Sequence, residues 1–271
     1  MIDDAVYLYA LARRGTLAGL DIEGVEEGRR VAVIACGGLD AVVSDVPRAA
    51  YEAACDPSAT AELAWVVPRA VRHDCVVRAV AAAAPALPAR FGAVFSSEMA
   101  LSRLVVSHAE TIASFLDNLA GKGEWSVRVW TVPASAADGL LATDPELAAR
   151  HARLPASAGA RYFAEKRLRE EALVAARRSA LAAARSVRAR LVAVAAVRDL
   201  PLRKPEPSGR EMIVNLACLL DDAEAESLLS SVRTTALEEG PPGLEFETEG
   251  PWPAFHFCPD LAEDRGTEPT A

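Results

Sequence analysis

The side chains that could perform acid–base, nucleophilic or metal chemistry are scattered along this chain. The four histidines lie far apart, at His73, His108, His151 and His256. Potential metal ligands crowd together only at His73-Asp74-Cys75. Residues two apart on a helix point to different faces, so this triplet does not converge on one ion. We interpret it as a polar pair on a helix surface beside a small apolar cysteine.

Carboxylates and glycine-rich motifs do not supply a reaction centre either. Glu170-Glu171 and Asp221-Asp222 are adjacent pairs without a spaced partner, and neighbouring helical residues cannot act jointly on one substrate. The sequence contains no GxGxxG, GxxxxGK(S/T), GxSxG or HExxH motif. We therefore predict no catalytic residues, no metal and no cofactor, and a protein that is not an enzyme.

Cysteine use and overall charge indicate the cellular compartment of the protein and exclude some classes of partner. The chain has five cysteines, Cys36, Cys55, Cys75, Cys218 and Cys258. Their number is odd and no two of them form a CxxC pair, which argues against both a disulfide framework and a zinc site. A formal net charge of −9 argues against nucleic acid as a partner. The acidic start of the chain and the lack of an uncharged apolar run long enough to span a bilayer predict a cytoplasmic protein with no membrane segment.

The elements of the first half predict an α+β domain over residues 1–133. The chain is long and apolar enough for one large or two small domains, with 271 residues of which 51% are hydrophobic. We expect strands at 6–11, 31–36, 39–46, 90–95 and 125–132, with a hairpin at Gly37-Gly38. Helices are expected at 58–84, broken or kinked at Pro68, and at 98–119. This order favours an antiparallel sheet with helices on one face.

A composition break at 133–155 separates a second α+β domain, 134–260, from the first. A continuous helical pattern over 157–198 carries an apolar stripe that resembles a narrow coiled-coil seam. The stripe that we expect to pack against another helix, within the chain or across a dimer, consists of Leu173, Ala176, Ala180, Ala184, Val187, Leu191 and Val194. A strand at 211–220, a helix at 221–239 and a strand at 243–249 follow, and we predict that the charged tail at 261–271 is disordered.

Charge is distributed unevenly over this second half. Residues 161–190 carry nine Arg or Lys against three Glu, whereas residues 206–271 carry three basic and fifteen acidic residues. Two explanations stay open. The charged faces could be solvated, with the basic helix lying near its own acidic domain, or they could form a docking surface for an oppositely charged partner.

Two short motifs stand out for their conformation. Residues 88–92 end a helix and enter a strand, with Arg90 and Phe91 on opposite faces and Gly92 permitting close approach. Residues 249–257 combine glycine, two prolines and three aromatic rings. We expect this segment to form a rigid corner that closes the second domain, in which Trp252 is a buried anchor and the guanidinium of Arg90 or the ring of Phe91 stacks on the corner. The alternative is a platform that faces a partner. The residues of interest are Gly250, Pro251, Trp252, Pro253 and Phe255.

These motifs, in this order, resemble the gas vesicle protein F/L family (GvpF/GvpL). The likeness extends over about 250 residues and includes the stretches 7–9, 41–46, 72–74, 87–92, 121–125, 198–201 and 250–253. The closing pattern of the family is usually Gly-Pro-Trp-Pro-Pro-Tyr-x-Phe. Here Ala254 and Phe255 replace the Pro and Tyr, so any role of a tyrosine hydroxyl at this place is lost while the aromatic ring is kept.

The resemblance implies a non-enzymatic accessory protein of gas vesicle biogenesis, located in the cytoplasm and at the vesicle. It implies binding to the major shell protein GvpA and to other accessory proteins, with self-association open. It also implies two α+β domains, the second ferredoxin-like, with a prominent helical element. Two other functions stay open: a helical adaptor that oligomerises through the 157–198 seam, and an enzyme built on a ferredoxin-like scaffold.

Overall fold

The chain forms two compact units. The computed structural model describes residues 4–17, 19–55 and 63–261. Unit 1 combines Met1–Lys122 with Trp252–Ala271, and unit 2 is Gly123–Pro251. The boundary that we expected near residue 133 therefore falls about ten residues earlier. The reason is that the strand β6 (Lys122–Thr131) pairs within the sheet of unit 2 and not with the sheet of unit 1.

The sheet of unit 1 is built around its first strand. Its order is β2 (Ala32–Cys36), β3 (Leu39–Pro47), β1 (Asp4–Arg13) and β4 (Ala86–Pro88), and the short β5 (Val94–Phe95) also pairs with β1. The expected hairpin is confirmed, because Cys36 pairs with Leu39 and the two glycines between them have φ of 55° and 81°. Two successive positive φ values are what a tight hairpin turn requires.

Strand β1 is buried on both faces, and this decides how the helices are arranged. Tyr7 and Tyr9 face a core completed by α1 (Arg48–Cys55) and α2 (Leu63–Ala83). Leu8 and Leu11 face a second core completed by α3 (Glu98–Ser107) and α4 (Ala109–Leu119). A shift of register between Leu8 and Ala10 keeps both faces apolar. Helices therefore cover both faces of this sheet, where we expected one.

Three local expectations in unit 1 need correction. Helix α2 is continuous through Pro68, so the expected break is absent, although the proline removes one backbone hydrogen bond of the helix. The expected start of that helix lies outside the described residues. The expected helix at 98–119 divides at His108 into α3 and α4. The expected strand at 90–95 is a turn followed by β5, because Gly92 has a φ of 85°.

Unit 2 has a ferredoxin-like arrangement of strands and helices. Its elements are β6, α5 (Pro133–Thr143), α6 (Pro145–Ala152), α7 (Ala158–Val192), β7 (Ala196–Asp199), β8 (Glu211–Asp221), α8 (Ala225–Glu239) and β9 (Glu245–Trp252). The sheet order is β7-β8-β6-β9. Apart from α5 and α6, the elements follow the order β-α-β-β-α-β, which with this sheet order is the ferredoxin-like pattern. Helices α7 and α8 pack on the same face of the sheet.

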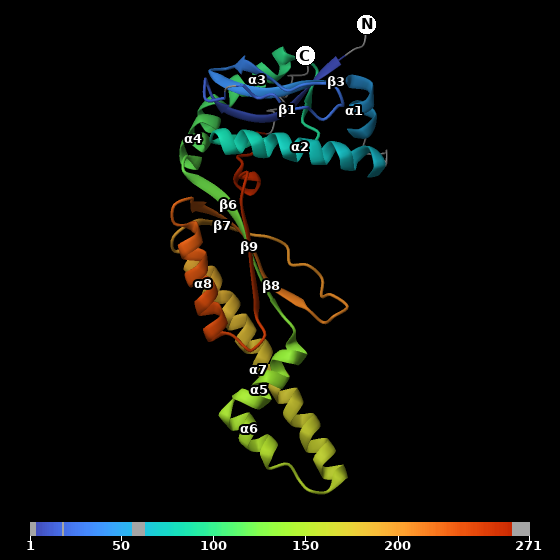
Figure 1. Cartoon of the computed structure of the whole chain (residues 1–271), viewed down its shortest axis with the longest axis vertical. Helices are drawn as coiled ribbons and strands as arrows, with labels where there is room; N and C mark the ends of the chain where they lie inside the picture. Colours follow the sequence, from blue (N-terminus) through green and yellow to red (C-terminus); the bar gives the residue numbers. More distant parts are fainter. Residues whose placement is uncertain (1–3, 18, 56–62, 262–271) are drawn as a thin grey trace, which may run out of the picture. The chain divides into compact units, whose positions relative to one another are not determined.

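Helix α7 is the longest element of the chain, with 35 residues and a length of about 52 Å. Its second half packs on β8 and α8, where Val187 and Leu191 enter the core of unit 2. Its first half extends past the sheet and carries α5 and α6, which Figure 1 shows in green and yellow. Ala172 and Ala176 there meet Ala136 and Ala137, and these small side chains allow close approach of the two helices. The helix ends at Val192, so residues 193–198 do not continue it.

The remaining elements complete unit 1. After β9 the chain returns to unit 1 at Trp252 and forms a short 3₁₀ turn, η1 (Phe255–Phe257). The predicted disordered tail lies outside the described residues except for Leu261. Among the residues that the structure describes, no helix combines the length and the apolar character needed to cross a membrane.

Candidate functional site

A buried polar chain supports the turn at Ala89–Gly92. The carbonyl oxygen of Ala89 can only accept, so His73 Nε2–H donates to it at 3.2 Å. The hydroxyl of Tyr7 then donates to His73 Nδ1 at 3.0 Å and accepts from the backbone N–H of Gly92 at 3.0 Å. Burial lowers the pKa of His73 below its ordinary value. Our interpretation of His73 as part of a polar pair on a helix surface is therefore wrong.

The side chains of this turn lie at the surface above the polar chain. Phe91 is partly exposed, and its ring forms T-shaped contacts with the rings of Tyr7 and His73, at centroid distances of 6.4 and 5.8 Å. Arg90 is exposed. A Cβ at Gly92 would meet no atom within 4 Å, so glycine is needed there for its positive φ and not for space. A shallow pocket of about 210 Å³ lies beside the turn and is lined by Ala5, Arg48, Tyr51, Glu52, Gly92, Val94, Phe95 and Ser96.

A second polar cluster holds α2 against the loop before β2. Arg69 donates to both carboxylate oxygens of Glu26, at 2.8 and 2.9 Å, and the hydroxyl of Tyr51 donates to the same carboxylate at 2.8 Å. The guanidinium of Arg69 also lies 4.3 Å from the centre of the Trp65 ring. Burial raises the pKa of Glu26, but these hydrogen bonds outweigh it and leave the pKa below its ordinary value. The cluster is therefore a structural ion pair.

The expected aromatic corner is present in part, and its partner differs from the expected one. Trp252 is half-buried, and the guanidinium of Arg78 lies 4.0 Å from the centre of its ring. Arg78 in turn donates to Asp74. Pro253 is buried and Phe255 is exposed. Trp252 is thus not the buried anchor that we expected, and its cation is supplied by α2 and not by Arg90.

The structure brings the two sequence motifs together at another point. The thiol of Cys258 lies 3.6 Å from the carbonyl oxygen of Pro88 and 3.3 Å from that of Ala254. Residues 254–258 therefore lie against β4, which leads directly into the Arg90–Gly92 turn. Residues 88–92 belong to unit 1, and so does the second motif from Trp252 onwards.

Gly250 and Pro251 lie in unit 2, where β9 runs beside β6. A Cβ at Gly250 would lie 2.8 Å from the carbonyl oxygen of Glu124 and 2.8 Å from the Trp125 ring. A Cβ at Gly123 would lie 2.5 Å from that of Pro251. The peptide bond between Gly250 and Pro251 is cis. Glycine is required at both positions because the two strands approach so closely.

The α7 seam is partly as expected. Ala180, Val187 and Leu191 are buried, and Leu173 is half-buried beside the cluster that joins α7 to α5. Val194 is exposed because the helix ends before it. Sequence reasoning missed Leu168, Ala172 and Ala183, which are buried on the same side. The seam is filled by elements of the same chain.

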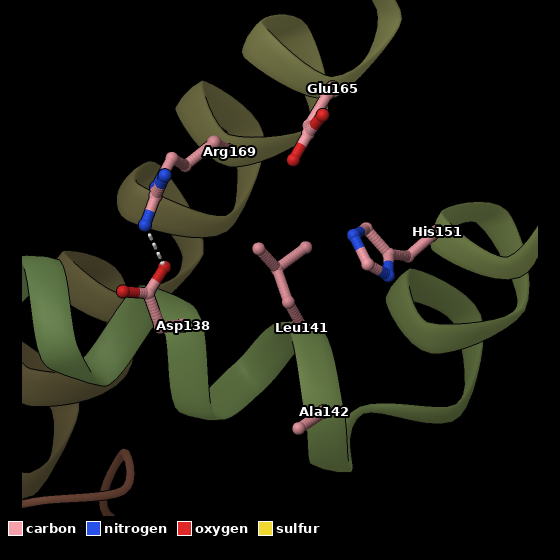
Figure 2. A pocket seen from close by; sticks show the side chains of 6 residues that line it. All are labelled: Asp138, Leu141, Ala142, His151, Glu165 and Arg169. Carbon is pink, nitrogen blue, oxygen red and sulfur yellow. Dashed lines mark hydrogen bonds and ion pairs between the residues drawn. The ribbon is translucent and has the colours of Figure 1, made fainter. Parts of the chain in front are cut away.

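A pocket of about 270 Å³ lies where α5, α6 and α7 meet. Arg169 donates to Asp138 at 2.7 Å. In Figure 2, Leu141 lies between this pair and His151, and Glu165 projects from α7 toward the same space. No nucleophile is placed beside a base among the residues that line this pocket. Within the described ranges, no group of three His, Cys, Asp or Glu side chains could hold a metal ion.

Basic residues of α7 pair with acidic residues of the same unit. Arg169 pairs with Asp138, Arg177 with Glu211, Arg188 with Asp199 and Arg190 with Glu239, at N–O distances of 2.7, 3.5, 2.8 and 3.2 Å. The first of our two explanations for the uneven charge therefore accounts for part of the basic helix. Other basic residues of α7 lie outside these pairs.

Comparison with known proteins identifies the family. The family model described as "Gas vesicle synthesis protein GvpL/GvpF" matches residues 5–259. The chain belongs to the GvpL/GvpF family. Gas vesicle protein L2 of Halobacterium salinarum is 30% identical, with 97% of this chain and 94% of that protein covered. Gas vesicle protein L of Streptomyces sp. (strain CB03234) is 26% identical, with 97% and 96% covered.

Solved structures of GvpF proteins share the fold. GvpF from Microcystis aeruginosa superposes with a TM-score of 0.61 at 17% identity, covering 94% of this chain and 99% of that one. GvpF from Anabaena sp. PCC7120 gives a TM-score of 0.63 at 16% identity, covering 95% and 99%. The α+β fold with two antiparallel sheets and a long helix is thus a GvpL/GvpF fold, and the family gives the chain a role connected with gas vesicles.

Proposed function

We propose that this protein is an accessory protein of gas vesicle assembly that binds the shell protein GvpA and other accessory proteins. The observation that carries the proposal is the set of large apolar side chains that its helices leave exposed. On α2 these are Leu63, Val67 and Val71, on α3 Met99 and Val106, and on α7 Phe163, Val174 and Leu181. On each helix, successive residues of this set are 4, 7 or 11 positions apart and therefore lie on one side of it. Apolar side chains that share one exposed helix face are typical of surfaces that bind other proteins.

The proposed role requires no catalysis. A hydrophobic shell subunit aggregates when it is free, so assembly at the growing vesicle needs a binder that covers it. The polar clusters around His73 and Glu26 are saturated by bonds that hold the fold. A self-associating adaptor built on the α7 seam is disfavoured, because β8, α8 and α5 already fill that seam.

Co-expression with GvpA tests the proposal. A tagged form of this protein should recover GvpA or another vesicle accessory protein from the soluble fraction, and the tag on an unrelated acidic protein should recover neither. If neither is recovered while all the proteins stay soluble, the proposal is wrong. Recovery of a small molecule together with turnover of that molecule would favour the enzyme instead.

A further inference from the structure

Helix α7 carries a second stripe on the side away from its buried seam. We call it the outer stripe and define it as Phe163, Arg167, Val174, Arg178, Leu181, Arg185 and Val192. Successive members are 4, 7, 4, 3, 4 and 7 residues apart. With 3.6 residues per turn, each of these separations returns to the same side of the helix. The outer stripe is therefore a straight band along most of α7, about 44 Å long at 1.5 Å per residue.

The apolar members of the outer stripe are open to solvent. The exposed fractions are 70% for Phe163, 67% for Val174, 55% for Leu181 and 47% for Val192. The opposite side of α7 holds the buried Ala176, Ala180 and Val187. Since that side supplies the packing of the helix within the fold, the outer stripe is not needed to hold α7 in place. Apolar residues repeated in this way on an exposed helix are typical anchors for a second helix.

The charges of the outer stripe define the partner. Arg167, Arg178 and Arg185 alternate with the apolar residues, and they form no ion pair with the part of the chain that the structure describes. Four other arginines of α7 are paired with acids of unit 2, whereas these three keep their charge toward solvent. Glu170, at the edge of the band, is exposed as well. An acidic partner would pair with the three arginines, whereas a second copy would place arginine against arginine.

We propose that the outer stripe is the docking surface for an acidic amphipathic helix of a partner protein. The proposal rests on the accessory role above and states which surface and which partner chemistry it uses. Large apolar side chains of the partner helix contact Phe163, Val174 and Leu181, and its Glu or Asp residues pair with the arginines between them. The net charge of −9 on the whole chain disfavours an acidic helix on the acidic parts of the surface, so the band of unpaired arginines is the favoured place for it.

Peptide binding tests the docking surface directly. The probe is a fluorescent 28-residue helical peptide with Leu on one face and Glu beside it, and its matched control has Lys in place of every Glu. We expect the acidic peptide to bind and the basic peptide to bind at least tenfold more weakly. Added salt should weaken binding of the acidic peptide, because the arginines stay partly exposed in the complex.

Charge-reversal variants identify the surface. Arg167→Glu, Arg178→Glu and Arg185→Glu together should weaken acidic-peptide binding at least tenfold. The matched control reverses three other exposed basic residues, Arg103→Glu, Arg203→Glu and Lys204→Glu, and should keep binding within about twofold. A second variant, Val174→Ser with Leu181→Ser, should also weaken binding and leaves the charge unchanged. Circular dichroism and melting of each variant separate lost binding from lost fold.

Three outcomes overturn the inference. One is acidic-peptide binding that survives reversal of the three stripe arginines. The second is the absence of acidic-peptide binding to the wild type, and stripe-dependent binding to vesicles of anionic lipid would then make the band a membrane surface. Recovery of GvpA or an accessory protein by the wild type and equally by the stripe variants would reject this surface but keep the accessory role. Stripe-dependent binding of the acidic peptide without recovery of any vesicle protein would support this surface and reject the accessory role.

Discussion

At the scale of single residues, one hydroxyl group links the first strand to the surface turn of unit 1. Tyr7 lies in the middle of β1, and its hydroxyl bonds both to His73 on α2 and to the backbone of Gly92. These groups are 66 and 85 residues from Tyr7 in sequence, so the bonds connect a strand, a helix and a loop. The turn that displays Arg90 and Phe91 thus depends on a bond made in the core.

Replacing Tyr7 with Phe tests this link. The change leaves the buried His73 Nδ1 and the partly buried Gly92 N–H without this partner, so the free energy of unfolding should fall by about 1–3 kcal/mol. Urea unfolding measures the change. Tyr162→Phe is the matched control, because that ring is exposed, and it should change stability by less than about 0.5 kcal/mol. Equal effects of the two variants would contradict the role of the Tyr7 hydroxyl.

The buried His73 predicts how stability depends on pH. Its pKa is lowered from 6.5 by burial, so the unfolded chain takes up this proton more readily than the folded chain. The stability that comes from neutral His73 is therefore complete above pH 6.5 and decreases as the pH falls below 6.5 toward the folded pKa. Urea midpoints measured at pH 7.5 and 5.5 should show this loss. In His73→Gln the loss over the same interval should be smaller, and an unchanged loss would show that other groups cause it.

At the scale of elements, the two sides of α7 have different tasks. The buried side joins α7 to the sheet, to α8 and to α5. The opposite side is the outer stripe, which carries arginines and exposed apolar side chains. A substitution on the first side should change stability, and a substitution on the second should change binding.

Two leucines on α7 separate these tasks. Leu191→Ala should lower the free energy of unfolding by about 2–5 kcal/mol, because Leu191 is fully buried between α7 and the sheet. Leu181→Ala removes the same atoms from the outer stripe and should change it by less than about 0.5 kcal/mol. Chemical denaturation of both variants compares them. If Leu191→Ala cost no more than Leu181→Ala, the assigned packing of α7 would be wrong.

A cation–π contact between Arg78 on α2 and the Trp252 ring holds the end of β9 to α2. Because Trp252 is half-buried and covered by Arg78, we expect the contact to be worth about 0.5–1 kcal/mol. A double-mutant cycle with Arg78→Gln and Trp252→Leu measures this coupling energy. Asp74→Asn is the control for the ion pair on the other side of Arg78. Additive effects of the two substitutions would show that the ring and the guanidinium do not interact.

At the scale of the whole molecule, each unit has its own core and the chain has a large negative charge. Unit 1 buries apolar residues on both faces of its sheet, and unit 2 buries them between its sheet and α7 and α8. The net charge of −9 gives a repulsion that opposes association between copies of the chain. The outer stripe is a local departure from this overall charge.

Solubility should follow the net charge. The sequence pI is about 5.1, so repulsion between copies vanishes near pH 5 and self-association should be greatest there. Light scattering from pH 4 to pH 8 measures this. Arg203→Glu with Lys204→Glu makes the chain more negative and should move the scattering maximum to lower pH. A maximum that stays in place would point to association through apolar surfaces instead.

Much of the fold could be predicted from local patterns. The Gly37-Gly38 hairpin, the doubly buried first strand and the long helix are each determined by neighbours in sequence, through turn geometry and apolar periodicity. The collinear motifs over 250 residues were enough to place the chain in the GvpL/GvpF family. Such patterns state which residues are apolar and how often they recur.

They do not state which element covers a given face, and only the tertiary structure decided this. His73 has polar neighbours in sequence, yet β1 and the Ala89 turn enclose it. Strand β6 alternates like a strand of either unit, and its pairing with β8 and β9 moved the boundary to Gly123. Trp252 meets Arg78 and not Arg90 because α2 lies beside the returning chain. Each of these outcomes depends on contacts between residues far apart in sequence, which local periodicity does not encode.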